Sequence, residues 1–201
     1  NAKNIGVVFG QRTQLWWDIP VAETLKLMKY MYKIPDEIYK KNIELFYDIL
    51  GIGDFIDSPV RQLSLGQRMR ADLCAAMLHN PDILFLDEPT IGLDVVVKEN
   101  IRKFIKEINR IRNTTVILTT HDMPDIEKLC SRVLVIDKGN IIYNGNIEKL
   151  KEKYGYAEVL SVETEKSIDH IEDLYKLDID RCDEDKGKYI IEYNRKNIKS
   201  S

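Results

Sequence analysis

Apolar residues recur along this chain with two different spacings, and the two spacings alternate. Short apolar runs have the length of a strand and lie at residues 5–9, 83–86 and 115–120. Longer stretches repeat an apolar residue every three to four positions, as one face of a helix does, and lie at residues 36–50, 65–79 and 97–111. The alternation predicts an α/β fold with a mainly parallel sheet, flanked by helices that cover both of its faces.

The pattern changes near residue 155, where the sequence becomes more charged. Two short strands are expected at 132–137 and 140–143, joined by a turn at Lys138 and Gly139. Beyond them a strand (158–163), a helix (167–177) and a hairpin around Lys186 are expected. We therefore divide the chain into an α/β domain and a small C-terminal α+β module whose completeness the pattern leaves open. The predicted bounds are 1–154, with a helical subdomain at about 21–80, and 155–201.

Charge and cysteine content narrow the class of protein. The 201 residues include 30 basic and 33 acidic side chains, so the formal net charge is -3. This balance argues against a nucleic-acid partner, which needs a basic face. The cysteines are odd in number and widely spaced, which predicts reduced thiols at Cys74, Cys130 and Cys182. No apolar run approaches the roughly 20 residues that cross a bilayer, so any membrane role is expected to depend on a partner.

The N-terminus is abrupt. The chain begins at Asn1 without an initiator methionine and enters a strand pattern at Ile5. A natural N-terminus usually has some lead-in, so the sequence predicts a fragment of a longer protein.

Two carboxylates follow directly after one of the apolar runs. Asp87 and Glu88 come after Leu86, at the carboxyl end of the predicted strand, which is where ligands meet parallel sheets. Mg²⁺ takes oxygen ligands, so Asp87 is a candidate metal ligand for phosphoryl transfer. Glu88 is a candidate general base for the attacking water. The alternative is a strand exit with two solvated charges, and this pair alone does not decide between the two.

A second candidate site opens the helix predicted at residue 65. Ser64 followed by Gln67 is a capping box, which by itself indicates only the start of a helix. A helix N-terminus also presents free N–H groups to an anion, and Gly66 would let a phosphate approach the backbone. Two further side chains follow strands: His121 could donate a hydrogen bond to a phosphate, and Gln11 is a weaker candidate. Taken singly, each of these residues is more often structural.

Taken together, these positions resemble the ATPase domains of ABC transporters. The order and approximate spacing are those of the family's Q-loop, signature, Walker B, D-loop and switch histidine, here Gln11, Leu63–Gln67, Asp87–Glu88, Gly92–Asp94 and His121. Five motifs in order are a specific signal, whereas each one alone is not. The predicted hairpin at 132–145 also looks like the strand pair that follows the switch histidine in this family.

The resemblance implies a P-loop NTPase-like fold and a head-to-tail dimer that holds two ATP molecules with Mg²⁺. Ser64, Gly66 and Gln67 of one subunit would face the γ-phosphate held by the other, and Asp94 would link the two sites. Gln11 would bridge Mg²⁺ or the lytic water to the transporter contact surface. The remaining roles implied are metal ligand, base and γ-phosphate contact for Asp87, Glu88 and His121.

The implied function is ATP binding and hydrolysis coupled to transport, with export expected from the short helical subdomain and the small C-terminal module. The expected partners are a transmembrane permease subunit and a second ATPase subunit, at the cytoplasmic face of the membrane. Trp16 and Trp17 are candidates for the permease contact, although both could instead pack within the helical subdomain. Two other functions stay open: a soluble ABC ATPase acting on ribosomes or DNA, and an inactive regulatory fragment.

The sequence departs from the family in two ways. Leu65 stands where the signature usually has glycine, and Ile91 and Gly92 stand where serine and alanine are common. More important, these residues include no glycine-rich loop that ends in Gly-Lys-Ser/Thr, the Walker A motif that cradles phosphates. This chain alone is therefore expected to bind ATP very weakly and to be inactive.

Overall fold

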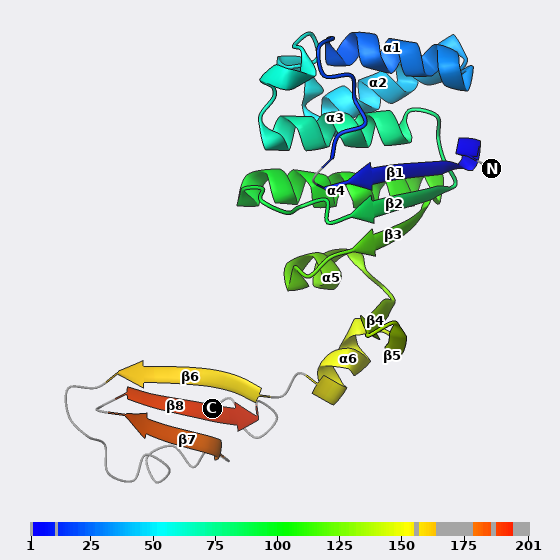
Figure 1. Cartoon of the computed structure of the whole chain (residues 1–201). Helices are drawn as coiled ribbons and strands as arrows, with labels where there is room; N and C mark the ends of the chain where they lie inside the picture. The colour runs from blue at the N-terminus through cyan, green and yellow to red at the C-terminus, as the bar shows by residue number, and fades with distance from the viewer. Residues whose placement is uncertain (1, 11, 155–156, 164–178, 186–187, 195–201) are drawn as a thin grey trace. The chain divides into compact units, whose positions relative to one another are not determined.

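Three parallel strands form the central sheet in the computed structural model. They are β1 (Ile5–Phe9), β2 (Ile83–Asp87) and β3 (Thr115–Thr119), in the order β1-β2-β3 (Figure 1). Their last residues are register partners, so Phe9, Asp87 and Thr119 lie side by side at one edge. The parallel sheet and the strands expected at the apolar runs are confirmed, and the carboxyl ends of all three strands meet at this edge.

The structure describes residues 2–10, 12–154, 157–163, 179–185 and 188–194, which fall into two compact units. The first unit is residues 1–129 and the second is residues 130–201. This division by packing does not test the boundary expected at residue 154, which stays a prediction.

The central sheet is covered on one face. Side chains alternate between the two faces of a strand. On one face they are buried, as at Val8 and Leu86, whereas on the other Phe9, Phe85 and Ile117 are 51%, 37% and 45% exposed. The expectation of helices on both faces is therefore not met by the described residues. An apolar run predicts a strand that can be buried on both sides, but a second covering layer has to come from other segments.

Three helices form the helical subdomain: α1 (Val21–Tyr32), α2 (Asp36–Leu50) and α3 (Leu65–Met77). They are stacked above the strands in Figure 1, and α3 lies directly against β1. Short 3-10 turns at Ile52–Asp54 and Val60–Gln62 connect α2 to α3, and another at Ala2–Asn4 precedes β1. These helices lie within the stretch 21–80, and its status as a separate subdomain stays a prediction.

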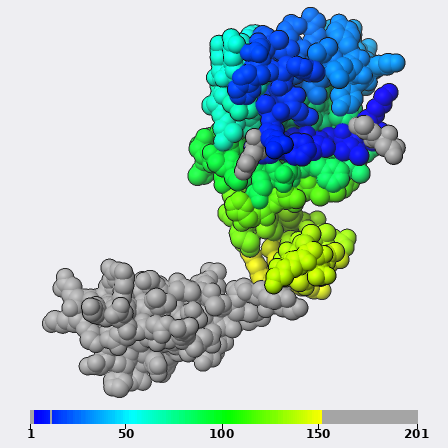
Figure 2. Space-filling view, in the orientation of Figure 1, coloured from blue at the N-terminus to red at the C-terminus, as the bar shows by residue number. Residues whose placement is uncertain are grey.

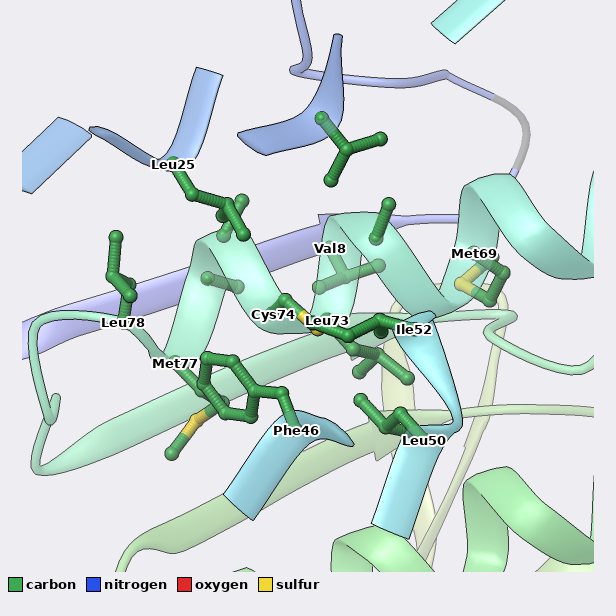
Figure 3. Packing of buried hydrophobic residues seen from close by; sticks show 14 of the residues in the cluster. Val8, Leu25, Phe46, Leu50, Ile52, Met69, Leu73, Cys74, Met77 and Leu78 are labelled. Atoms are coloured by element: carbon green, nitrogen blue, oxygen red, sulfur yellow. The ribbon is translucent and has the colours of Figure 1, made fainter. Parts of the chain in front are cut away.

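Helix α3 is the centre of the core. Figure 3 shows its side chains Met69, Leu73, Cys74 and Met77 among buried residues of α1 and α2. Burial raises the pKa of the Cys74 thiol well above its ordinary value, so this cysteine is a neutral core side chain. The helix ends at Met77, two residues before the expected end.

The long helix α4 (Val95–Arg112) packs its apolar stripe into the same core. Phe104 of α4 and Phe46 of α2 meet edge to face, with ring centroids 6.0 Å apart. Asn113 follows the last residue of the helix as its C-cap, with a left-handed backbone (φ 52°) that asparagine tolerates. A short helix, α5 (Met123–Leu129), follows β3 and contacts α4.

The second unit begins with a hairpin of β4 (Val133–Asp137) and β5 (Asn140–Gly145), as expected. Helix α6 (Ile147–Tyr154) follows, and then an antiparallel sheet in the order β6-β8-β7. These strands are β6 (Ala157–Glu163), β7 (Ile179–Asp185) and β8 (Lys188–Asn194). The helix expected at 167–177 and the hairpin turn expected at Lys186 lie outside the described residues. No helix within the described ranges is both long and apolar enough to cross a membrane.

Candidate functional site

Asp87 and Glu88 lie at the edge where the three strands end. The Asp87 carboxylate accepts a hydrogen bond from the Thr119 hydroxyl at 2.6 Å, and Thr119 is its register partner on β3. The backbone carbonyl of Asp87 accepts from the N–H of Gly10 at 2.7 Å. Asp87 is therefore fixed from both neighbouring strands.

The backbone at Gly10 passes so close to the backbone of Asp87 and Glu88 that only glycine fits there. A Cβ atom added there would lie 2.3 Å from the carbonyl oxygen of Glu88 and 2.9 Å from that of Asp87. Both are backbone atoms that cannot move aside without distorting the site. The glycine therefore lets the chain after β1 pass directly over the two carboxylate residues.

Glu88 has an unusual backbone conformation. Its φ is 50°, in the left-handed region that a glutamate seldom occupies. Its N–H donates to the carbonyl of Thr119 at 3.0 Å, which holds the turn in place. Such strain often accompanies a functional position, because the surrounding structure has to maintain it.

His121 lies next to Glu88. Its Nδ1 is 2.8 Å from the Oε1 of Glu88, and because the carboxylate can only accept, Nδ1 carries the proton. The hydrogen bond and the negative charge of Glu88 raise the pKa of His121 above its ordinary value. While this contact exists, one oxygen of Glu88 is engaged and cannot take a proton from water.

A hollow of about 460 Å³ opens beside these groups, lined by Phe9, Gly10, Arg12, Asp87 and Glu88. This volume falls in the range of small-molecule sites. Arg12 brings a guanidinium, a group that pairs well with phosphate oxygens. The sequence reasoning missed Arg12, Gly10 and Thr119. The signal for Arg12 was its position just beyond a strand end.

The donor set fits a magnesium ion that is held mainly by a nucleotide. Asp87 supplies one oriented carboxylate, and the described residues contain no group of three or more metal-binding side chains. Mg²⁺ in phosphoryl-transfer sites commonly takes one or two carboxylates, with phosphate oxygens and waters as the other ligands. Asp87 is the residue that would hold it.

Gln11 lies outside the described residues, but its two neighbours are described. The N–H of Arg12 donates to the carbonyl of Phe9 at 3.3 Å, so these two described residues lie close together. The role expected for Gln11 stays a prediction.

Ser64 and Gln67 form the capping box that the sequence predicted. The Ser64 hydroxyl accepts from the Gln67 N–H at 3.2 Å, and the Gln67 side chain accepts from the Ser64 N–H at 2.9 Å. Gly66 faces α4, where an added Cβ would lie 3.1 Å from a methyl group of Val97. The close packing against Val97 thus explains why a glycine stands at position 66. Its role toward a phosphate stays a prediction.

Two of the residues that depart from the family pattern, Leu65 and Gly92, lie next to each other. A Cβ added at Gly92 would lie 3.3 Å from a terminal methyl group of Leu65, and Gly92 has a left-handed φ of 69°. Leu65 thus lies over the space where a side chain at position 92 would begin. This contact explains how leucine is accommodated in the signature segment.

Asp94 caps α4 at its N-terminus. Its carboxylate accepts from the N–H of Val97 at 2.9 Å. Lys98, the residue after Val97, forms an ion pair of 2.5 Å with Asp122, which neighbours His121. The first turn of α4 thus contacts the start of α3 through Val97 and Gly66, and it contacts the segment that carries His121 through Lys98.

A buried charge pair supports the same region. Asp125 of α5 is completely buried and pairs with Arg102 of α4 at 2.6 Å. It also accepts a hydrogen bond of 2.5 Å from the hydroxyl of Thr90, two residues after Glu88. The turn after β2 and the segment after β3 are thus tied to one helix.

One family model matches residues 33–125, under half of the chain, with the description "AAA domain, putative AbiEii toxin, Type IV TA system". The chain is 33% identical over 150 residues to the ABC transporter ATP-binding protein NatA of Bacillus subtilis, covering 75% of this chain and 61% of that protein. It is also 33% identical over 151 residues to the methionine import ATP-binding protein MetN 2 of Enterococcus faecalis, covering 75% and 44%. The chain therefore spans less than two thirds of the length of these relatives.

Two solved structures are similar over the same part of the chain. One is cbiO1 from Clostridium perfringens, described as part of the ABC transporter complex cbiONQ, with a TM-score of 0.66 and 28% identity over 76% of this chain and 61% of that one. The other is an ATP-binding cassette solved as a dimer in a post-hydrolysis state with ADP and Pi. It has a TM-score of 0.62 and 26% identity over 72% of this chain and 63% of that one.

Proposed function

We propose that the chain is an ATP-binding domain of the ABC type, which binds ATP at the carboxyl end of β1, β2 and β3 and hydrolyses it. One observation carries this proposal: at the ends of two neighbouring strands, Thr119 is hydrogen-bonded to both Asp87 and Glu88, and Glu88 is hydrogen-bonded to His121. The hollow between Arg12 and these carboxylates gives the phosphates a place to bind.

Glu88 acts as the general base. A water molecule attacks the γ-phosphorus, its proton passes to the Glu88 carboxylate, and ADP leaves. Asp87 would hold Mg²⁺ together with the phosphates, and the ion would supply positive charge that offsets the charge on the phosphate oxygens. Thr119 orients Asp87 for this task through its 2.6 Å hydrogen bond.

His121 changes partner in this proposal. In the structure its Nδ1–H donates a hydrogen bond to Glu88, and the raised pKa of His121 favours its charged form. A bound γ-phosphate offers a stronger negative charge, so the imidazolium moves to the phosphate. Both oxygens of Glu88 are then available to accept a proton from water.

The hydrolysing unit is a dimer in this proposal. The N-terminal ends of α3 and α4 carry Ser64, Gly66, Gln67 and Asp94, and Val95 and Val96 beside them are 78% and 70% exposed. Such exposed apolar side chains next to polar groups suit a subunit interface. A second ATPase subunit would receive this surface, and an ATP-binding cassette similar to this chain was solved as a dimer.

The transport role follows from the relatives. We propose that the protein couples hydrolysis to a transmembrane permease subunit, and lies peripherally at the cytoplasmic face of the membrane. The export direction stays a prediction, because a methionine import protein is as similar to this chain as NatA. The net charge of -3 supports the expectation of no nucleic-acid partner.

The test is Glu88→Gln in the intact protein with its permease. We expect ATP binding to persist while steady-state hydrolysis falls by about 100-fold or more, as loss of a general base predicts. Glu107→Gln, at a half-buried glutamate of α4 that pairs with Arg110, is the matched control and should hydrolyse ATP normally. Normal hydrolysis in Glu88→Gln would show that another group is the base.

A further inference from the structure

Asp72 is a buried carboxylate that the proposed mechanism does not use. It lies on α3, eight residues after Ser64, and is 3% exposed. One oxygen, Oδ1, accepts two hydrogen bonds from the chain that follows Gln11. The donors are the hydroxyl of Thr13 at 2.9 Å and the backbone N–H of Gln14 at 3.1 Å. A charged side chain at such depth needs partners, and these are the ones it has.

Arg68 contacts the same segment one helical turn earlier. Its guanidinium carbon lies 4.7 Å from the centroid of the Trp17 ring. Residues four apart share one face of a helix, so Arg68 and Asp72 contact the two ends of the segment Thr13–Trp17 from one face of α3.

The segment Thr13–Trp17 is also joined to its surroundings on either side. The Gln14 side chain donates to the carbonyl of Val7 in β1 at 3.1 Å, and the carbonyl of Trp17 accepts from the N–H of Arg61 at 3.0 Å. In Figure 1 this segment is the blue coil that leaves β1 and passes α3 on its way to α1, and Figure 2 shows it at the surface. It is an irregular segment held by specific side chains.

We propose that Asp72 is a positioning residue which, together with Arg68, holds the segment Thr13–Trp17 on α3. The chain directly after Gln11 and the N-terminus of α3 at Ser64 then keep a fixed relation to one another. The nucleotide roles of Gln11 and Ser64 rest on the proposed function, whereas the attachment itself does not.

A carboxylate makes this attachment sensitive to protons. Burial raises the pKa of Asp72 to about 6, against the opposing effects of the Gln14 N–H, the Thr13 hydroxyl and the charge of Arg68. Arg68 is the charged group that faces it, and Cys74 on the same helix is neutral. Above pH 6 the two hydrogen bonds end on a negative oxygen, which strengthens them. Below pH 6 they end on a neutral carboxyl group.

The only two tryptophans of the chain, Trp16 and Trp17, lie in the attached segment and give a direct readout. In a Trp16→Phe background, the fluorescence of Trp17 reports the segment. Without Asp72 or the Thr13 hydroxyl, acrylamide should quench Trp17 more strongly and its emission should shift to the red. The same measurement between pH 5 and pH 8 should show a step near pH 6 in the parent protein.

Three variants separate attachment from mere packing. Thr13→Val removes one donor at nearly constant shape, and Asp72→Ala removes the acceptor. Asp72→Asn keeps an acceptor oxygen but no titrating group, so the quenching of Trp17, which is 47% exposed, should stay at the parent level while the step near pH 6 disappears. Asp57→Asn, at an exposed aspartate of the same subdomain, is the control and should leave both features unchanged. Thr13→Val tests the attachment even where Asp72→Ala fails to fold.

ATP hydrolysis by the intact protein tests the positioning role. Thr13→Val should lower kcat about fivefold, the effect of one lost hydrogen bond of about 1 kcal/mol, with KM for ATP unchanged. Unchanged Trp17 quenching in Thr13→Val would overturn the attachment, and changed quenching with normal kcat would overturn the positioning role. An intact parent protein without ATPase activity would instead contradict the proposed function, and the fluorescence result would still decide the attachment.

Discussion

The Nδ1 atom of His121 lies 2.8 Å from Oε1 of Glu88, so the proposed base and its neighbouring histidine are hydrogen-bonded. This contact joins the turns after β2 and β3. It also makes the charge of His121 depend on Glu88.

The first prediction concerns the titration of His121. Glu88 raises its pKa, so His121 should stay protonated to higher pH than a free histidine, and the stabilising contact should be lost as pH rises through the raised pKa. Glu88→Gln should lower that pKa. NMR titration of the imidazole protons measures it, and His79, whose pKa burial lowers, is an internal control that should not move. An unchanged pKa for His121 in Glu88→Gln would contradict the ion pair.

The second prediction concerns Gly10. Gly10→Ala should lower the free energy of unfolding by about 3 kcal/mol, because the new methyl group meets backbone oxygens of Asp87 and Glu88 that cannot rotate away. Gly66→Ala should cost clearly less, because its nearest neighbour is the Val97 side chain, 3.1 Å from the new atom. Urea unfolding of both variants measures the difference. Equal costs would show that the close approach at Gly10 is not maintained in solution.

The third prediction concerns the buried pair of Arg102 and Asp125. Asp125→Ala should lower the free energy of unfolding by about 3–5 kcal/mol, since it leaves Arg102 buried without its main partner. Lys128→Ala, which breaks a more exposed ion pair with Glu99 on the same two helices, should cost ~1 kcal/mol or less. Chemical denaturation measures both. A cost for Asp125→Ala no larger than that for Lys128→Ala would show that Arg102 finds water or another partner.

Much of the fold could be predicted from local pattern. The helix at Asp36–Leu50 was predicted with its observed bounds, because apolar spacing, an acidic first turn and Gly51 at its end are all local signals. The end of α3 was placed two residues late. Helical spacing continues to His79, but the backbone of Asn80 turns left-handed (φ 55°) ahead of Pro81. Such an ending depends on neighbouring contacts as well as on sequence.

For the site, the sequence by itself determined which side chains end up at strand ends and helix starts, because strand and helix periods are local properties. Asp87, Glu88, His121 and Ser64 could be identified in this way. Only the tertiary structure decided the contacts between them: the hydrogen bond of His121 to Glu88, the packing of Gly66 on Val97, and the attachment of Thr13 to Asp72. These contacts join residues that are 31 to 59 positions apart, and their geometry depends on how strands and helices pack, which no local pattern specifies.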